Sequence, residues 1–346
     1  AWTYQVDDDQ AAVQSLGVGA TLTDTVTVTS LDGTEQSIEI TITGTNDVPV
    51  ISGELSGSVI EDEVLTASGL LSIADPDAGE SFFNEATVPG AHGSLTITPD
   101  GAWTYELDSG LPEVQGLGEG EFLTDTVTVT SLDGTEQSIE ITITGTNDVP
   151  VISGELSGSV IEDEVLTASG LLSIADPDAG ESFFNEATVP GAHGSLTITP
   201  DGAWTYELDS GLPEVQGLGE GEFLTDTVTV TSLDGTEQSI EITITGTNDV
   251  PIISGDVSGS VVEDEVFAAS GQLSIADVDG GEAFFNEGTV SGAHGSLTID
   301  ANGAWTYKVD NDQAAVQALG ADDVLRDTVT VTSLDGTEQS IEITIS

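Results

Sequence analysis

The stretch Thr-Gly-Thr-Asn-Asp-Val-Pro occupies residues 43–49 and returns unchanged at residues 144–150 and 245–251. Each copy closes a run in which Thr and Ile alternate, and a segment containing Ile-Ser-Gly follows it. The proline fixes its own φ angle and biases the residue before it towards an extended conformation. The Asn and Asp place two oxygen-bearing side chains at the same point. We interpret this stretch as a stiff joint between repeated units and as part of a metal site.

The spacing of the joint reveals an internal repeat of 101 residues, the interval that also separates the four tryptophans. Such a period in a chain of 346 residues predicts a tandem array of domains. Residues 46–146 and 147–247 are identical at every position, and residues 248–346 form a diverged last copy. Residues 1–45 match the second half of a repeat, so we expect the chain to be a piece of a longer protein.

Apolar and polar residues alternate within each repeat, which is the pattern of half-buried β-strands. Trp103, Tyr105 and Leu107 alternate with Ala, Thr and Glu, and Val127 and Val129 alternate with threonines. One apolar and one polar face per strand is typical of antiparallel sheets that pack on a single core. About seven such strands per repeat, with one buried Trp and no cysteine, predict an all-β fold of tandem immunoglobulin-like Greek-key β-sandwiches in a linear array.

The connections between the strands carry their own signals. Asp-Gly pairs at residues 100–101 and 133–134 supply the positive φ of tight hairpin turns. A longer connection rich in Gly, Glu and Gln predicts a helical turn around Val114. The first half of each repeat is less regular, and its three predicted strands are Val59–Ile60, Val64–Ile73 and Phe82–Val88.

Residues 1–45 contain only three predicted strands, at Ala1–Val6, Leu22–Ser30 and Ser37–Thr43. Their apolar faces lack an opposing sheet, and so few strands are only marginally stable alone. We therefore expect this half domain not to fold by itself. Its missing half would come from upstream sequence or from another copy of the protein, which would make the chain a unit of a filament.

Acidic residues dominate the composition: 63 Asp and Glu stand against two basic residues, Lys308 and Arg326, for a formal net charge of −61. Nucleic acids and anionic membranes are excluded as partners, because binding phosphates requires Lys and Arg. Without cysteine the chain forms neither disulfides nor thiolate metal sites. No apolar run reaches the roughly 20 residues of a membrane helix. The remaining class is a folded polyanionic array whose self-repulsion calls for cations.

Three carboxylate-rich motifs recur in every repeat: Glu-Asp-Glu early in the repeat, Asp-x-Asp before the third strand, and the Asn-Asp pair of the joint. Calcium takes about six to eight oxygen ligands, and Asp-x-Asp places two carboxylates on the same side of an extended chain. Solvation of turns and surfaces is the alternative role, but the recurrence of all three motifs near strand ends favours calcium. The candidate calcium ligands are Asn46, Asp47, Glu61, Asp62, Asp75, Asp77, Asn147, Asp148, Glu162, Asp163, Asp176, Asp178, Asn248, Asp249, Glu263, Asp264, Asp277 and Asp279.

Five motifs recur together along the whole chain: Thr-Gly-Thr-Asn-Asp-Val-Pro, Ser-Gly-x-Val-x-Glu-Asp, Gly-x-Leu-Ser-Ile-Ala-Asp-x-Asp, Gly-x-x-Thr-Tyr and Val-Gln-x-Leu-Gly. In this order they resemble the VCBS repeat, which builds the long extender regions of giant bacterial surface adhesins secreted by type I systems. The resemblance implies a cadherin-like sandwich, calcium at the domain junctions, and a role in cell adhesion or biofilm.

Cadherins carry a comparable joint, Asp-x-Asn-Asp-Asn, and an Asp-x-Asp pair in the following domain. The sequence departs from the cadherin pattern, since neither Thr146 nor the residue before it is the Asp that the pattern places ahead of Asn-Asp, and it lacks an Asp-Arg-Glu motif. Fewer calcium ions per junction than in cadherins are therefore expected. By the similarity to cadherins, the ligands at the second joint would be Asn147, Asp148, Asp176, Asp178 and either Glu61 or Asp62 of the preceding domain.

Other features favour structural roles over catalysis. The histidines, one per repeat in Gly-Ala-His-Gly-Ser, are typical of turns, and the nucleophile motif Gly-x-Ser-x-Gly is absent. A paired-carboxylate glycosidase site duplicated identically along a chain would be unusual, so we do not expect an enzyme. One alternative stays open, a flat exposed surface that binds a glycan or ice through the threonines Thr126, Thr128, Thr130, Thr142 and Thr144.

The sequence therefore predicts three cadherin-like sandwiches and one half domain in a secreted bacterial protein of the cell surface or biofilm matrix. Its function would be structural, as a calcium-stiffened extender that projects a terminal binding module or builds an extracellular fibre. Its partners would be neighbouring repeats and other copies of itself. The alternative is an array that itself binds a surface ligand. Identical copies favour the extender, because a spacer needs length and stiffness, whereas a recognition surface tends to be singular.

Overall fold

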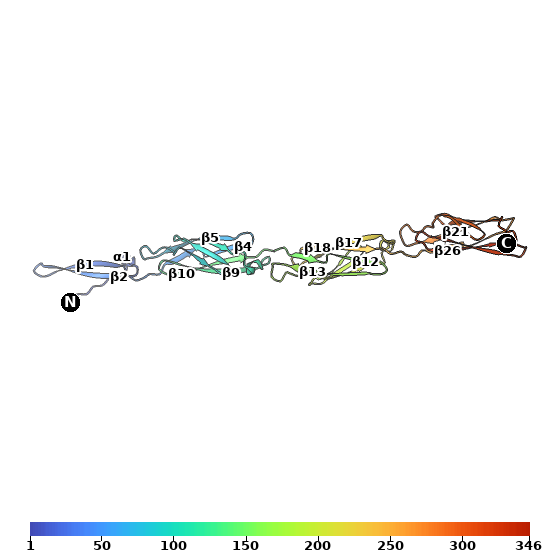
Figure 1. The fold of residues 1–346 in the computed structure, drawn as a ribbon. Coiled ribbons are helices and arrows are strands. Elements are labelled where there is room, and N and C mark those ends of the chain that lie inside the picture. Colours follow the sequence, from blue (N-terminus) through green and yellow to red (C-terminus); the bar gives the residue numbers. More distant parts are fainter. The chain divides into compact units, whose positions relative to one another are not determined.

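The computed structural model describes residues 1–346, and almost all of its regular structure is β-strand. The chain divides into two compact units, residues 1–150 with 175–182 and residues 151–174 with 183–346. Figure 1 colours the strands along the chain, from β1 in blue to β26 in red. None of the three helices, each of four residues, is long and apolar enough to cross a membrane.

The first unit contains a β-sandwich of two sheets. The five-stranded sheet is antiparallel, in the order β3 (Val50–Gly53), β5 (Thr66–Ala74), β8 (Ala102–Leu107), β7 (Gly93–Ile97) and β6 (Ala86–Pro89). The three-stranded sheet has the order β4 (Ser56–Ile60), β10 (Glu136–Thr144) and β9 (Phe122–Thr130). The connection from β8 to β9 contains the helix α2 (Pro112–Gln115).

The second unit contains two further sandwiches with the same strand orders. One consists of β11 (Val151–Gly154), β13 (Thr167–Ala175), β16 (Ala203–Leu208), β15 (Gly194–Ile198) and β14 (Ala187–Pro190), with β12 (Ser157–Ile161), β18 (Glu237–Thr245), β17 (Phe223–Thr231) and the helix α3 (Pro213–Gln216). The other consists of β19 (Ile252–Gly255), β21 (Ala268–Ala276), β24 (Ala304–Val309), β23 (Gly295–Ile299) and β22 (Gly288–Ser291), with β20 (Ser258–Val261), β26 (Glu338–Ile345) and β25 (Leu325–Thr332).

Each sandwich buries one tryptophan between its two sheets. Trp103 is 1% exposed, and its Nε1–H donates to the backbone oxygen of Glu54 at 2.9 Å. Gly57 and Gly69 make room for the indole, since a Cβ atom on Gly69 would lie 2.5 Å from a ring carbon. The alternation along β8 explains this placement, because Trp103 and Tyr105 both point into the core.

A carboxylate also lies in this core. Asp125 on β9 is fully buried and accepts hydrogen bonds from the backbone N–H groups of Ala91 and His92 and from the hydroxyl of Tyr105. Burial by itself raises the pKa of Asp125, but the three hydrogen bonds favour the charged form and lower the pKa below its ordinary value. The buried charge is therefore fully hydrogen-bonded and helps to fix the β6–β7 turn against β9.

The structure confirms the all-β sandwiches, both hairpin turns and the helical turn at Val114. It corrects the strand count, because β3 was not predicted. It also corrects the strand at Phe82–Val88, since β6 begins only at Ala86 and Phe83 makes a single bridge to Ser131.

One strand pair departs from the antiparallel pattern that the alternation indicated, because β4 pairs with β10 in parallel. The chain crosses from one sheet to the other after β3 and crosses back after β4. Strand β4 therefore lies at the outer edge of β10 instead of forming a hairpin with a sequence neighbour. This crossing brings the end of β4 beside the end of β10, where the joint begins.

Residues 1–45 form a two-stranded antiparallel sheet, β1 (Thr21–Thr29) with β2 (Glu35–Thr43), and the helix α1 (Ala11–Gln14). The predicted strand at Ala1–Val6 was wrong, since this segment pairs with no strand. Its counterpart β8 is held between β5 and β7, and residues 1–45 contain no counterpart of either. Trp2 is accordingly 62% exposed.

Candidate metal centre

Glu61 reaches the site from a tight turn at the end of β4. Its backbone N–H donates to the oxygen of Thr144 on β10 at 3.1 Å, and Ile60 and Val64 exchange two backbone hydrogen bonds of 2.9 Å across the turn. Asp62, inside this turn, has a φ angle of 60°. The side chain of Glu61 is fully buried as a result, whereas Asp62 is exposed.

Asp148 comes from the joint, and Asp178 comes from the loop that follows β13. The backbone N–H of Asp148 donates to Asp178 Oδ2 at 2.9 Å, and that of Asp178 donates to Asp176 Oδ1 at 3.0 Å. The N–H of Ala179 attaches this loop to the oxygen of Gly116 at 3.1 Å. Asp-x-Asp thus forms a turn and not the expected extended chain, because the first carboxylate caps the N–H of the second Asp.

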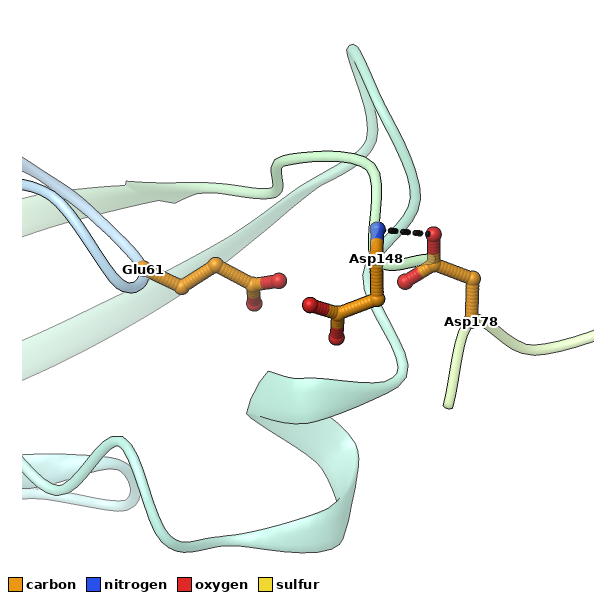
Figure 2. A group of neighbouring side chains, drawn as sticks. All are labelled: Glu61, Asp148 and Asp178. Carbon is orange, nitrogen blue, oxygen red and sulfur yellow. Dashed lines mark hydrogen bonds between the residues drawn. The ribbon is translucent and has the colours of Figure 1, made fainter. Parts of the chain in front are cut away.

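The carboxylates of Glu61, Asp148 and Asp178 converge in the first unit. One oxygen from each lies within 4.8 Å of the other two. Figure 2 shows the Glu61 and Asp148 carboxylates pointing towards each other, with Asp178 bonded to the backbone of Asp148. Glu61 Oε2, Asp148 Oδ2 and Asp178 Oδ1 are buried and have no hydrogen-bond partner. Buried polar atoms are normally satisfied, so three unsatisfied carboxylate oxygens at one point indicate a place for a cation.

The electrostatics of this cluster are those of buried carboxylates that repel one another. Burial raises the pKa of Glu61 to about 7, and the charges of Asp148, Asp62 and Asp178 add to the effect. Burial also raises the pKa of Asp148, followed by the charge of Asp178. No basic residue belongs to the cluster. Like charges at this spacing disfavour ionisation unless a cation neutralises them.

The second unit holds the corresponding residues at the next joint. The N–H of Asp249 donates to Asp279 Oδ2 at 2.8 Å, and the N–H of Thr247 donates to Glu162 Oε1 at 3.1 Å. Glu162 Oε2, Asp249 Oδ2 and Asp279 Oδ1 are again buried without a hydrogen-bond partner. Burial is the largest cause that raises the pKa of all three carboxyl groups, and the charges of neighbouring carboxylates raise it further.

Two further predicted sets are partial in this sequence. At the first joint the N–H of Asp47 donates to Asp77 Oδ2 at 2.9 Å, and Asp77 Oδ1 is buried without a partner. Residues 1–45 nevertheless contain no counterpart of Glu61. Glu263 has a buried Oε2 without a partner, and no joint follows it in the sequence.

The remaining predicted ligands lie beside these sets, and their binding of calcium stays a prediction. The Asn of each joint is exposed and donates its side-chain N–H to the backbone oxygen of the next residue, as seen at Asn46, Asn147 and Asn248. The first Asp of each pair caps its turn, as seen at Asp75, Asp176 and Asp277. The Asp after each Glu is exposed, as seen at Asp62, Asp163 and Asp264.

Acidic residues that the motifs did not single out border these sets. In the second unit Glu282 lies near Asp279, Asp335 and Glu222. Burial is the largest cause that raises the pKa of Glu282, and the charges of these neighbours raise it further. In the first unit the side-chain N–H of Asn46 donates to Asp133 Oδ2 at 3.3 Å. A signal was present, because these acids also recur every 101 residues. The Asp of the Asp-Gly hairpin had been interpreted only as a turn residue.

Calcium suits the observed donor set. Two oxygens bound to one calcium ion at about 2.3–2.6 Å lie no more than about 5 Å apart, which the three converging oxygens satisfy. All three donors are carboxylates, the ligand class of hard cations. Zinc and softer metals prefer the nitrogen and sulfur ligands that this set lacks.

The comparison with protein families gives one extended match. The model described as a bacterial cadherin-like domain matches residues 46–145, 147–246 and 248–346. A CS domain model matches residues 20–67 and 124–168, each of which runs across a joint. A search of curated proteins found no match.

Similar solved structures include PcdhgB3 EC1-4, with 18% identity over 99% of this chain and 86% of that chain and a TM-score of 0.46. Drosophila N-cadherin EC1-4 is 15% identical, with 96% of this chain and 85% of that chain covered and a TM-score of 0.39. Mouse cadherin-23 EC22-24 is 16% identical, with 87% of this chain and 99% of that chain covered and a TM-score of 0.48. Because these scores lie below 0.5, the assignment rests on the family model, which matches three tandem domains. The chain belongs to the family of bacterial cadherin-like domains.

Proposed function

We propose that this chain is a calcium-stiffened extender segment of a secreted bacterial surface adhesin or biofilm fibre, with domains at 46–146, 147–247 and 248–346 and a half domain at 1–45. Cadherin-like repeats are a structural, non-enzymatic kind of domain and are extracellular. The observation that carries the proposal is the convergence of Glu61, Asp148 and Asp178, whose buried oxygens lack partners. The adhesin context and type I secretion rest on the resemblance to VCBS repeats.

The three carboxylates belong to three different segments, which explains how a cation would stiffen the joint. Glu61 is fixed by a turn of the first sandwich, Asp148 lies in the joint, and Asp178 lies in a loop of the next repeat. A calcium ion bound to all three would cross-link these segments. It would also neutralise the local repulsion in a chain of net charge −61.

Calcium binding at one joint should be separable from binding at the next. The double variant Glu61→Gln with Asp178→Asn removes two charges from the first set, and we expect it to weaken calcium binding there by at least about tenfold because two anionic ligands are lost. The sites of the Glu162 set should keep their affinity. Isothermal titration of the 346-residue chain measures both.

The charge-matched control is Glu85→Gln with Asp108→Asn, two exposed acids outside the clusters, which should leave the titration unchanged. If the control weakens binding as much as the site variant, calcium is responding to the overall charge and not to this site.

The threonine surface remains the alternative function. Thr126 and Thr128 are exposed on β9, where Thr128 bonds the Ser138 hydroxyl of β10 at 3.0 Å. Threonine is also a good strand former on a solvated face, so exposure by itself does not indicate a ligand. Binding of the chain to glycans or to ice that is lost when Thr126→Glu and Thr128→Glu are combined with the equivalent changes in the other two repeats would favour this alternative.

We also propose that either upstream sequence or another copy of the chain covers the apolar face of residues 1–45. Val28 is 44% exposed, whereas its counterpart Val129 is 1% exposed in the complete sandwich. Strand β2 has a free edge where β10 pairs with β4. Mass measurement at increasing concentration tests the second case. Association that Val28→Glu reduces would favour another copy, and a strict monomer at all concentrations would rule out completion by another copy.

A further inference from the structure

The chain has only three non-glycine residues with positive φ, and each follows a predicted calcium-binding glutamate. They are Asp62, Asp163 and Asp264, with φ angles of 60°, 59° and 57°. Residues with a Cβ atom rarely adopt this left-handed conformation, which Asp and Asn tolerate better than most others. A disfavoured conformation repeated at the same point in three sandwiches calls for a local reason.

The left-handed residue determines which side chain of the turn faces inward. Ile60 and Val64 close the turn with two backbone hydrogen bonds, and the N–H of Glu63 donates to the oxygen of Glu61 at 2.7 Å. Within this turn Glu61 is fully buried, while Asp62 and Glu63 are exposed. The reversal at Asp62 therefore buries one carboxylate of the turn in the cluster and leaves the next one exposed.

The Asp62 side chain is engaged within its own repeat. Its Oδ1 accepts a hydrogen bond of 3.3 Å from the side-chain N–H of Gln115, the last residue of α2. Asp163 and Gln216 repeat the contact at 3.2 Å. Asp62 is also not among the carboxylates that converge within 4.8 Å.

The third sandwich shows that this turn is set inside the repeat. Asp264 accepts from the side chains of Gln317 at 3.3 Å and Asn311 at 2.9 Å, and its own N–H donates to Asn311 Oδ1. It keeps the left-handed φ seen at Asp62 and Asp163. Glu263 beside it has a buried oxygen without a partner, as Glu61 has. The side chains that hold this turn thus belong to the same repeat as the glutamate.

We propose that Asp62 and Asp163 are positioning residues whose left-handed turn, held by Gln115 and Gln216, orients Glu61 and Glu162 for calcium, and that their own carboxylates do not bind the ion. This inference rests on the proposed calcium function and assigns a role within it. It distinguishes two adjacent acidic residues that the sequence presents as equivalent ligands.

Substitutions at both turns separate a positioning role from a ligand role, because the carboxylate can be removed with or without disfavouring the left-handed backbone conformation. Asp62→Gly with Asp163→Gly deletes both carboxylates but favours positive φ. Asp62→Val with Asp163→Val also deletes them but opposes positive φ, since a β-branched residue rarely adopts it. Glu61→Gln with Glu162→Gln serves as the ligand-loss reference. Calcium titration and thermal unfolding in chelator are measured for each 346-residue variant.

We expect the glycine pair to bind calcium with an affinity within about threefold of wild type, and the valine pair to bind at least about tenfold more weakly. The cost of the left-handed conformation in a residue with a Cβ atom corresponds to roughly a factor of ten in affinity. Asn at both positions should also preserve binding. Loss of affinity in the glycine pair equal to that of the Glu61→Gln reference would make Asp62 a ligand and overturn the inference. Wild-type affinity in a folded valine pair would overturn it as well. If the wild-type chain does not bind calcium, the proposed function itself fails, and the variants are not needed to show it.

Discussion

Replacing Trp103 with alanine is expected to destabilise the first sandwich by about 3–5 kcal/mol and to leave the second at wild-type stability. Trp103 is 1% exposed, and removing it leaves a cavity between Gly57 and Gly69, which have no side chains to fill it. The substitution also leaves the backbone oxygen of Glu54 without its Nε1–H donor.

Calorimetry of the full chain tests this expectation, because the identical second sandwich is an internal reference. One unfolding transition should move to lower temperature while the others stay in place. The matched control is Leu70→Ala, at a position 53% exposed, which should change stability by no more than about 0.5 kcal/mol. A uniform shift of all transitions would mean that the sandwiches do not unfold independently.

Replacing Asp125 with asparagine is expected to destabilise the first sandwich by about 1–3 kcal/mol at neutral pH, because an amide group cannot accept from three donors at once. The donors left unsatisfied would be among the N–H groups of Ala91 and His92 and the Tyr105 hydroxyl. The pKa values of Asp226 and Asp327 are also lowered, so Asp226→Asn and Asp327→Asn are the equivalent variants in the other two sandwiches.

The same variant predicts a pH dependence of definite sign. Because the folded-state pKa of Asp125 is lowered, its stabilising contribution is present above the unfolded-state pKa and is lost as pH falls through the folded-state pKa. The difference in melting temperature between wild type and Asp125→Asn should therefore shrink as the pH is lowered into the acid range. A difference that stays constant or grows would show that the hydrogen-bonded carboxylate is not its source.

Periodicity predicted those parts of the fold in which one strand face is buried. The alternation around Trp103 and around Val127 fixed β8 and β9 because each inward position carries an apolar side chain. The short strand β3 escaped the same analysis, and only Val59–Ile60 at the end of β4 was predicted, since four or five residues with Ser and Gly show little alternation. The parallel pairing of β4 with β10 depends on a crossing between the sheets that no local pattern encodes.

Asp125 illustrates a signal that was present but not used. It occupies an inward-facing position of β9, between Leu123 and Val127, so the alternation alone places a carboxylate in the core. Its two backbone donors could not be predicted in the same way, because they come from the β6–β7 turn, more than thirty residues earlier in the chain.

The candidate site was predicted as a set of motifs but not as a geometry. Recurrence pointed to the Glu-Asp-Glu, Asp-x-Asp and Asn-Asp motifs together, and one residue of each converges at Glu61, Asp148 and Asp178. The motifs do not show which acid of each pair faces inward. That choice depends on a left-handed turn at Asp62 and on a capped turn at Asp176, which are backbone features.

The central claim is that calcium stiffens the joints, and small-angle scattering of the 346-residue chain tests it most directly. Extracellular modules bind calcium with dissociation constants of about 10⁻⁴–10⁻³ M, and at ten times that concentration one site adds about 1.4 kcal/mol to the bound state. Several sites acting together would then favour one arrangement of the joints over many. In millimolar calcium the maximum dimension should exceed that measured in chelator, while circular dichroism shows the same strand content in both. The same maximum dimension in calcium and in chelator would contradict the account.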